Sequence, residues 1–164
     1  GHIYITGLHK IQKFDNTGKF IKVFKSLKEK DLAYLGQLPM DIEVDREGNI
    51  YVLVMDKEIE GKKEIRVSRV KKFDSQGNLL MSIGSREREE EDFWFPDEIA
   101  VDSNGHIYVA DGINHRIQVF DKQGEFLRSI KPNPFMIRWF NKSYIGWMLD
   151  NVSRPSRVVE LKKK

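Results

Sequence analysis

The chain has 164 residues, 40% of them hydrophobic and 32% charged, which is the composition of a globular domain with a core of its own. The absence of cysteine excludes a disulfide framework, a zinc site with cysteine ligands and a thiol nucleophile. The 28 basic and 25 acidic residues give a formal net charge of +3, which Lys162, Lys163 and Lys164 account for, so the clustered basic excess of nucleic-acid-binding proteins is missing.

A two-part sequence pattern occurs three times along the chain. The first part is a glycine, one further residue, Ile-Tyr and a branched residue, and it stands at residues 1–5, 48–52 and 105–109. The second part is Phe-Asp followed by a glycine turn, and it stands at residues 13–18, 72–77 and 119–124. Short strands and tight turns that repeat every 40–50 residues or so are typical of β-propeller blades. We therefore expect an all-β propeller of four-stranded antiparallel blades.

The repeats divide the chain into blades of one propeller domain, or of part of one. Residues 1–30 form an incomplete blade, because the chain begins inside the pattern, and residues 36–84 and 94–131 form one blade each. No apolar run approaches the roughly 18 residues of a membrane-spanning helix.

The sequence pattern fades after Pro132, and residues 132–164 are either a divergent blade or strands that close the ring. Three further strands are expected in this region, at residues 135–140, 144–149 and 157–161.

Five turns share the pattern Asp-x-x-Gly, and they begin at Asp15, Asp45, Asp74, Asp102 and Asp121. An aspartate here can accept backbone N–H bonds two residues on, and the glycine supplies a positive φ. Because the pattern occurs five times, we interpret these aspartates as turn-forming residues and not as calcium ligands.

The longer connections differ between the repeats. Residues 56–66 are an inserted loop after the second strand of the second repeat, and residues 85–95 connect the second repeat to the third. We expect the Asp-x-x-Gly turns on one side of the propeller and these long connections on the other, which makes the long-loop side the candidate binding face.

The segment from Pro96 to Leu127 resembles the repeat of the NHL family. Pro39 to Leu80 follows the same pattern, and the first repeat retains it at residues 3–5, 10–12 and 14–15. The resemblance implies a propeller of about six blades, of which this chain would hold roughly half. An open arc would leave an unpaired strand edge and a bare apolar face at each end. We expect a second copy or further blades of a longer protein to cover them, in preference to closure as a small four-bladed ring.

The resemblance is compatible with three functions. The first, which we favour, is a non-catalytic binding or assembly module that recognises a protein or another ligand on the long-loop face. The second is a lyase or lactonase with a metal at the propeller centre, and the third is an RNA-binding propeller like those of the tripartite-motif proteins. No catalytic, cofactor or metal site is predicted, and self-association or a protein partner is expected. The compartment is left open, with a preference for an extracytoplasmic one.

Five residues are candidates for partner binding. Lys10, Arg69 and Arg116 share one repeat position beside the variable loops, where they form either a basic rim for an acidic partner or pairs with acidic residues of neighbouring blades. Phe93 and Trp94 follow a run of polar residues, and they are either packed between blades or exposed as a contact surface. Phe95, which precedes Pro96, is expected in the core.

The four histidines lie in repeat register. His2 and His106 are equivalent to each other, as are His9 and His115. A residue that recurs at the same repeat position favours a structural role, so we assign these histidines to the scaffold.

Overall fold

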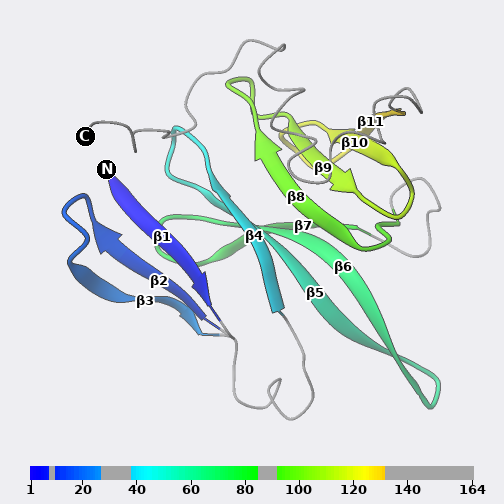
Figure 1. Ribbon diagram of the computed structural model, residues 1–164, viewed down its shortest axis with the longest axis horizontal. Helices are drawn as coiled ribbons and strands as arrows, with labels where there is room; N and C mark the ends of the chain where they lie inside the picture. Colours follow the sequence, from blue (N-terminus) through cyan, green and yellow to red (C-terminus); the bar gives the residue numbers. More distant parts are fainter. Residues whose placement is uncertain (8–9, 27–37, 85–91, 132–164) are drawn as a thin grey trace.

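The computed structural model describes residues 1–7, 10–26, 38–84 and 92–131, and these form three antiparallel β-sheets (Figure 1). The first sheet contains β1 (His2–Gly7), β2 (Lys10–Asp15) and β3 (Phe20–Ser26). The second contains β4 (Leu38–Val44), β5 (Ile50–Glu60), β6 (Lys63–Phe73) and β7 (Leu79–Ile83). The third contains β8 (Pro96–Val101), β9 (Ile107–Asp111), β10 (Arg116–Phe120) and β11 (Phe126–Ile130).

Each sheet is a meander in which consecutive strands pair, and β4 contacts β8 where the second and third sheets meet. This architecture confirms the expected all-β fold of blade-like sheets. The expected strands after Pro132 lie outside the described residues. The part of the chain that the structure describes contains no helix long and apolar enough to cross a membrane.

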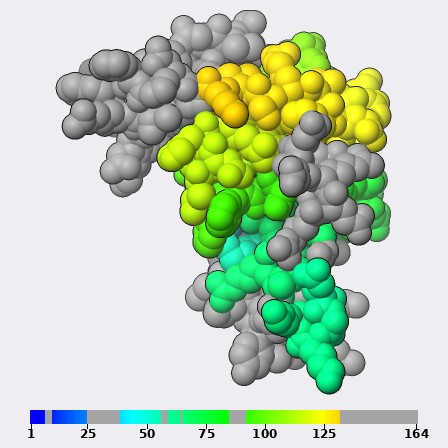
Figure 2. Space-filling model, turned by 90° about the vertical axis from the view of Figure 1, so that its right-hand side faces the viewer, coloured from blue at the N-terminus to red at the C-terminus, as the bar shows by residue number. Residues whose placement is uncertain are grey.

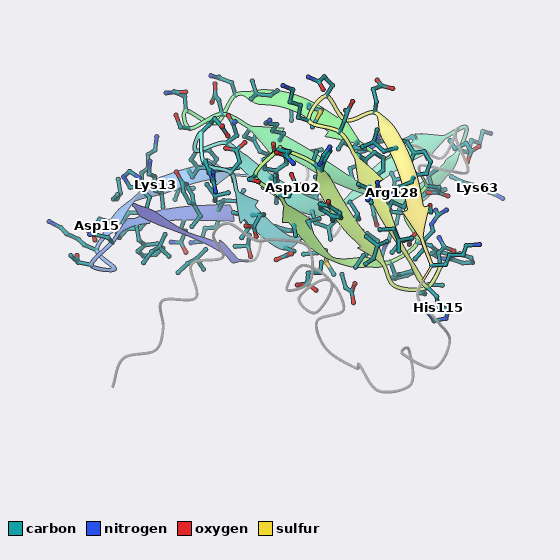
Figure 3. All side chains as sticks on the ribbon, turned by 90° about the horizontal axis from the view of Figure 1, so that it is seen from above. Lys13, Asp15, Lys63, Asp102, His115 and Arg128 are labelled. Carbon is teal, nitrogen blue, oxygen red and sulfur yellow. The ribbon has the colours of Figure 1, made fainter. Side chains whose placement is uncertain are left out.

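The turns and the long connections lie at opposite ends of the second and third sheets. The β4–β5 and β8–β9 turns are at the upper left of Figure 1, and the β5–β6 hairpin ends at the lower right. We call these ends the turn side and the loop side. In Figure 3, Lys63 at the hairpin tip and His115 lie on the same side of the molecule, away from Asp102. For these two sheets the structure confirms the expected division.

Residues 56–66 are not a loop, which corrects our expectation. They extend β5 and β6 into a hairpin that stays paired from Ile50 opposite Phe73 out to Glu60 opposite Lys63. Gly61, with a φ of +62°, occupies the first position of the two-residue connection, where a positive φ matches the twist of the two strands. Figure 2, which looks at the loop side, shows the hairpin projecting from the body of the molecule.

The three sheets are joined by apolar side chains that alternate along their strands. Ile11 and Phe24 of the first sheet pack against Ile50, Val52 and Phe73 of the second. A second cluster joins the next two sheets, and it includes Tyr51, Leu53 and Val70 with Ile107, Val109 and Phe120. The same strand positions therefore face the preceding sheet in the second and third repeats, because strand residues alternate between the two faces.

The five Asp-x-x-Gly turns have the geometry that the sequence predicts. In every turn the glycine has a positive φ, and the aspartate Oδ1 accepts the backbone N–H of the residue four positions on. At that position Asn49, Asn78 and His106 add a side-chain contact to Oδ2, at 2.7–2.9 Å. His106 thus takes the place of an asparagine in the turn, which confirms its structural role.

Candidate functional site

The loop side of the third sheet is organised around the carboxylate of Asp111. Asp111 ends β9 and is fully buried. Its Oδ1 accepts the backbone N–H of Trp94 at 2.7 Å, and its Oδ2 accepts Nδ2 of Asn114 at 2.8 Å and Nε of Arg116 at 2.9 Å. Hydrogen bonds and an ion pair are what make a buried carboxylate tolerable. One side chain therefore joins the segment before β8, the β9–β10 loop and the start of β10.

Arg116 extends this network to the connection that precedes the third sheet. Its Nη2 donates to the backbone carbonyl of Asp92 at 2.7 Å, and the buried Gln118 donates to the same carbonyl at 3.2 Å. The guanidinium is mostly buried, so its planar set of donors fixes the path of the chain at Asp92. Arg116 is therefore a structural residue of this loop side.

Three large apolar side chains are exposed on the segments that Asp111 joins. Trp94, Phe95 and Ile113 have exposed fractions of 59%, 55% and 50%, and we call them the aromatic patch. The backbone N–H of Ile113 donates to the carbonyl of Trp94 at 3.3 Å, which holds the two segments together. Exposed apolar side chains gathered on a rigid loop are typical of an interaction surface.

Phe95 adopts a left-handed backbone conformation, with a φ of +53°. This conformation is uncommon for a bulky residue, and it costs on the order of 1–3 kcal/mol. It turns the chain just before Pro96, where β8 begins, and leaves the Phe95 ring exposed. The expectation that Phe95 lies in the core was wrong, because the positive φ changes the direction in which its side chain leaves the strand.

An open depression of about 440 Å³ lies beside the aromatic patch. It is lined by Asp92, Trp94, Asn114, Arg116 and Lys131. The lining combines one aromatic ring with two cationic side chains, one carboxylate and one amide. Such a depression suits a ligand that has an apolar anchor and acceptor groups.

Asp97 is the second residue of β8, and its carboxyl interacts electrostatically with that of Asp111. Desolvation, together with the negative charge of Asp111, raises the pKa of the Asp97 carboxyl. A Cβ on Gly112 would lie 3.3 Å from the Phe95 carbonyl oxygen and 3.7 Å from an Asp97 oxygen, so these segments are closely packed.

The basic residues of the shared repeat position have different surroundings. Lys10 is exposed at the start of β2, and Arg69 donates from Nη1 to the carbonyl of Gly84 at 2.8 Å. Arg116 pairs with Asp111 of its own sheet, so the expected pairing with a neighbouring blade was wrong for this residue. A joint role of the three in a basic rim stays a prediction.

Phe93 and Trp94 point in different directions. Phe93 is 5% exposed and packs edge-to-face on Phe120, with 5.8 Å between ring centroids. Phe93 is therefore a core residue, which corrects its inclusion in a contact surface. Trp94, the next residue, is the most exposed member of the aromatic patch.

Asp111, Ile113 and Lys131 were not among the residues predicted from the sequence. One signal was present for Asp111, because the equivalent positions of the other repeats hold Gly7 and Val54. A charged residue at an otherwise uncharged strand position points to a role found in that repeat alone. Nothing comparable marked Ile113 or Lys131.

The described histidines are His2, His106 and His115. His115 is exposed in the β9–β10 loop with a φ of +48°, and its backbone N–H donates to the carbonyl of Gly112. His9 lies outside the described residues. Within the described ranges, no three His, Asp or Glu side chains lie close enough together to hold a metal ion.

Comparisons with known proteins agree with this architecture. The NHL repeat family matches residues 93–120, a segment that contains Trp94, Asp111 and Arg116. A probable peptidyl-alpha-hydroxyglycine alpha-amidating lyase of Caenorhabditis elegans is 32% identical over 103 residues, covering 60% of this chain and 27% of the relative. Human NHL repeat-containing protein 3 is 29% identical over 124 residues, covering 73% of this chain and 33% of the relative. The chain thus spans a third or less of the length of these relatives.

One solved structure supports the fold. A Bacteroides caccae protein of unknown function superposes with a TM-score of 0.52 at 14% identity, covering 81% of this chain and 43% of the other. At this identity the likeness concerns the fold alone.

Proposed function

We propose that this chain, whose residues 93–120 match the NHL repeat family, is a non-catalytic binding module that recognises a protein partner on its loop side. The observation that carries this proposal is the aromatic patch of Trp94, Phe95 and Ile113, which is exposed although its backbone is firmly held. Aromatic residues that are exposed on an ordered scaffold are typical anchors of protein interfaces.

The backbone that carries Trp94 is held by hydrogen bonds within the chain itself. Asp111 and Arg116 hold the segment before β8 through hydrogen bonds of 2.7–2.9 Å. A prearranged surface loses less conformational entropy on binding than a loop that must become ordered. The strained backbone of Phe95 fits this view, because such strain persists only where the surroundings impose it.

The depression beside the patch indicates the chemistry of the partner. Trp94 offers an apolar wall and Lys131 a positive charge, while the charge of Arg116 is already paired with Asp111 and Asp92 adds a carboxylate. A protein segment with one apolar anchor and one acidic residue that reaches Lys131 matches this lining, because its carboxylate would meet a cation while its anchor leaves water.

The titratable groups of this site already serve the fold. The Asp111 carboxylate accepts hydrogen bonds from three neighbouring residues at 2.7–2.9 Å, and the Arg116 guanidinium is held by Asp111 and by the Asp92 carbonyl. A general base or nucleophile must be within reach of a substrate. Because both groups already make these bonds within the fold, they are not placed to act as a base or nucleophile, which favours binding over catalysis.

A peptide selection tests the proposed function. A random-peptide phage library is selected on the immobilised chain, and enriched peptides are then measured by fluorescence anisotropy against three proteins. These are the wild type, Trp94→Ser and the matched control Leu127→Ser, whose side chain is exposed on β11 away from the patch. We expect peptides with an apolar anchor and a nearby acidic residue that bind the wild type and the control but not Trp94→Ser.

Two results would contradict the proposal. One is the absence of any enriched peptide, and the other is a set of peptides that bind Trp94→Ser as tightly as the wild type. Circular dichroism of the three proteins should coincide, since single substitutions of exposed residues change stability by roughly 0.5 kcal/mol or less.

A metal-dependent lyase is the second candidate, and the similarity to the amidating lyase of Caenorhabditis elegans favours it. Metal analysis of the purified chain separates the two candidates. The binding-module proposal expects no stoichiometric zinc or calcium. A stoichiometric metal that is lost in His115→Ala would favour the lyase.

A further inference from the structure

Residues 56–67 of β5 and β6 form a projecting part of the second sheet, which we call the hairpin arm. Among the described residues, β4 pairs with β5 only as far as Met55, and β7 pairs with β6 only as far as Val70. Beyond these positions β5 and β6 pair with each other alone, and at about 3.3 Å per residue the stretch from Asp56 to Glu60 extends roughly 16 Å. A two-stranded hairpin without further cover is at best marginally stable in water, so a partner for the arm would stabilise it.

The hairpin arm and the aromatic patch carry the most exposed large apolar side chains of the described residues. The exposed fraction is 73% for Ile59 on the arm and 59% for Trp94 in the patch. In Figure 3, Lys63 at the tip of the arm and His115 in the β9–β10 loop lie on the same side of the molecule. The loop side therefore presents both an apolar anchor and an apolar surface that such an anchor could cover.

The hairpin arm also has the chemistry that matches the depression beside Trp94. Ile59 lies directly opposite Glu64 in the ladder of β5 and β6. Residues that lie opposite each other in an antiparallel pair share one face of the sheet, with Cβ atoms about 5 Å apart. The arm thus combines an apolar anchor with an acidic residue beside it, and the depression offers Trp94 for the first and Lys131 for the second.

A second chain is better placed than the same chain to receive the arm. The arm projects from the body of the molecule, and its strands stay paired out to Glu60 opposite Lys63 (Figure 2). Folding back onto Trp94 of the same chain would break the backbone hydrogen bonds of this ladder. When the loop sides of two chains face each other, each arm can reach the patch of the other chain, and such reciprocal contacts close as a two-fold dimer.

We propose that the partner of the loop side is a second copy of this chain, and that each copy places its hairpin arm on the aromatic patch of the other. Ile59 of each copy packs on Trp94 of the other, and Glu64 of each copy pairs with Lys131 of the other. This inference rests on the proposed function, because it names the partner of the same patch.

Sedimentation velocity over a range of protein concentrations tests for the dimer and its apolar contact. The proteins are the wild type, Ile59→Ser, Trp94→Ser and the control Leu127→Ser, whose exposed side chain lies on β11. We expect the wild type and the control to dimerise alike. Ile59→Ser and Trp94→Ser should each weaken dimerisation about tenfold or more, because each removes the central side chain of the contact.

Two charge reversals test which segments meet. Glu64→Lys and Lys131→Glu each place like charges in both contacts of a reciprocal dimer, so each variant alone should dimerise more weakly than the wild type. In an equimolar mixture of the two variants, both contacts of the mixed dimer again join opposite charges. The mixture should therefore dimerise about as well as the wild type, a recovery that misfolding of either variant does not produce.

Three results would overturn the inference. They are a wild type that stays monomeric at every concentration, a dimer that Ile59→Ser leaves unchanged, and a mixture of the two charge reversals that dimerises no better than either variant alone. The binding-module proposal fails separately from this inference. It stands with another partner if the wild type is monomeric but binds selected peptides that Trp94→Ser does not bind.

Discussion

The backbone N–H of Trp94 donates to Oδ1 of Asp111 at 2.7 Å, across seventeen positions of sequence. This bond ties the segment that carries the most exposed aromatic side chain of the loop side to a fully buried carboxylate. The aromatic patch and the structural network beneath it are therefore parts of one unit. A change in the network should affect the patch as well as the stability of the fold.

Replacing Asp111 with asparagine should therefore be strongly destabilising. The substitution keeps the size of the side chain but removes the charge that balances the mostly buried guanidinium of Arg116. Breaking a buried ion pair by removing one partner costs about 3–5 kcal/mol. Urea unfolding of the wild type and Asp111→Asn measures the loss.

A double-mutant cycle with Arg116→Met isolates the pair. The double variant should lose less than the sum of the two single losses, because the uncompensated charge is then gone. Additive losses would show that the two side chains do not stabilise each other.

Phe93 and Trp94 should differ in their effect on stability although they are neighbours. Phe93→Ala removes a core ring that packs on Phe120, and such a truncation costs about 3–5 kcal/mol. Trp94→Ala removes a mostly exposed ring and should change the free energy of unfolding by roughly 0.5 kcal/mol or less. Urea unfolding of the two variants decides the assignment, and similar losses for both would refute it.

Gly84 is expected to tolerate no side chain. Its φ is +106°, and a Cβ would lie 2.7 Å from the Ser68 carbonyl oxygen and 2.9 Å from the Phe93 ring. Gly84→Ala should therefore combine backbone strain, on the order of 1–3 kcal/mol, with a clash against the core. The matched control is Gly18→Ala, because Gly18 also has a positive φ, of +86°, but no atom near its Cβ position.

Thermal unfolding should place Gly84→Ala well below Gly18→Ala. Equal midpoints would mean that the loss at Gly84 is backbone strain alone. Because the Gly84 carbonyl accepts a hydrogen bond from Arg69, a displacement here should also disturb the Arg69 side chain.

The sequence predicted the local features of this fold better than the contacts between distant segments. The Asp-x-x-Gly turns could be predicted because the aspartate and the glycine act within five residues of each other. Which of Phe93, Trp94 and Phe95 are buried could not be predicted. It depends on the positive φ of Phe95, and nothing in the residue type indicates that conformation. Asp111 was missed because its partners come from three separate segments.

The pH dependence of stability should distinguish two aspartates of opposite environment. Burial opposes the charged form of Asp102, but the hydrogen bonds from the His106 ring and from two backbone N–H groups outweigh it, so the pKa of Asp102 lies below its ordinary value of 3.8. A carboxyl with a depressed folded-state pKa stabilises the fold above its unfolded-state pKa, and this contribution is lost as the pH falls through the folded-state value. Asp102→Asn should therefore cost stability at neutral pH and progressively less below pH 3.8.

Asp97→Asn is the control with the opposite sign. Desolvation and the charge of Asp111 raise the pKa of Asp97, so its charged form destabilises the fold above the ordinary value. Asp97→Asn should be more stable than the wild type at neutral pH, and this advantage should shrink as acid protonates Asp97 in the wild type. Urea unfolding of the three proteins at neutral pH and in a series down to acid measures both differences. The prediction fails if the stability difference between each variant and the wild type does not vary with pH. Neither carboxyl would then have a different pKa in the folded and unfolded chains, and the hydrogen bonds of Asp102 would not favour its charged form.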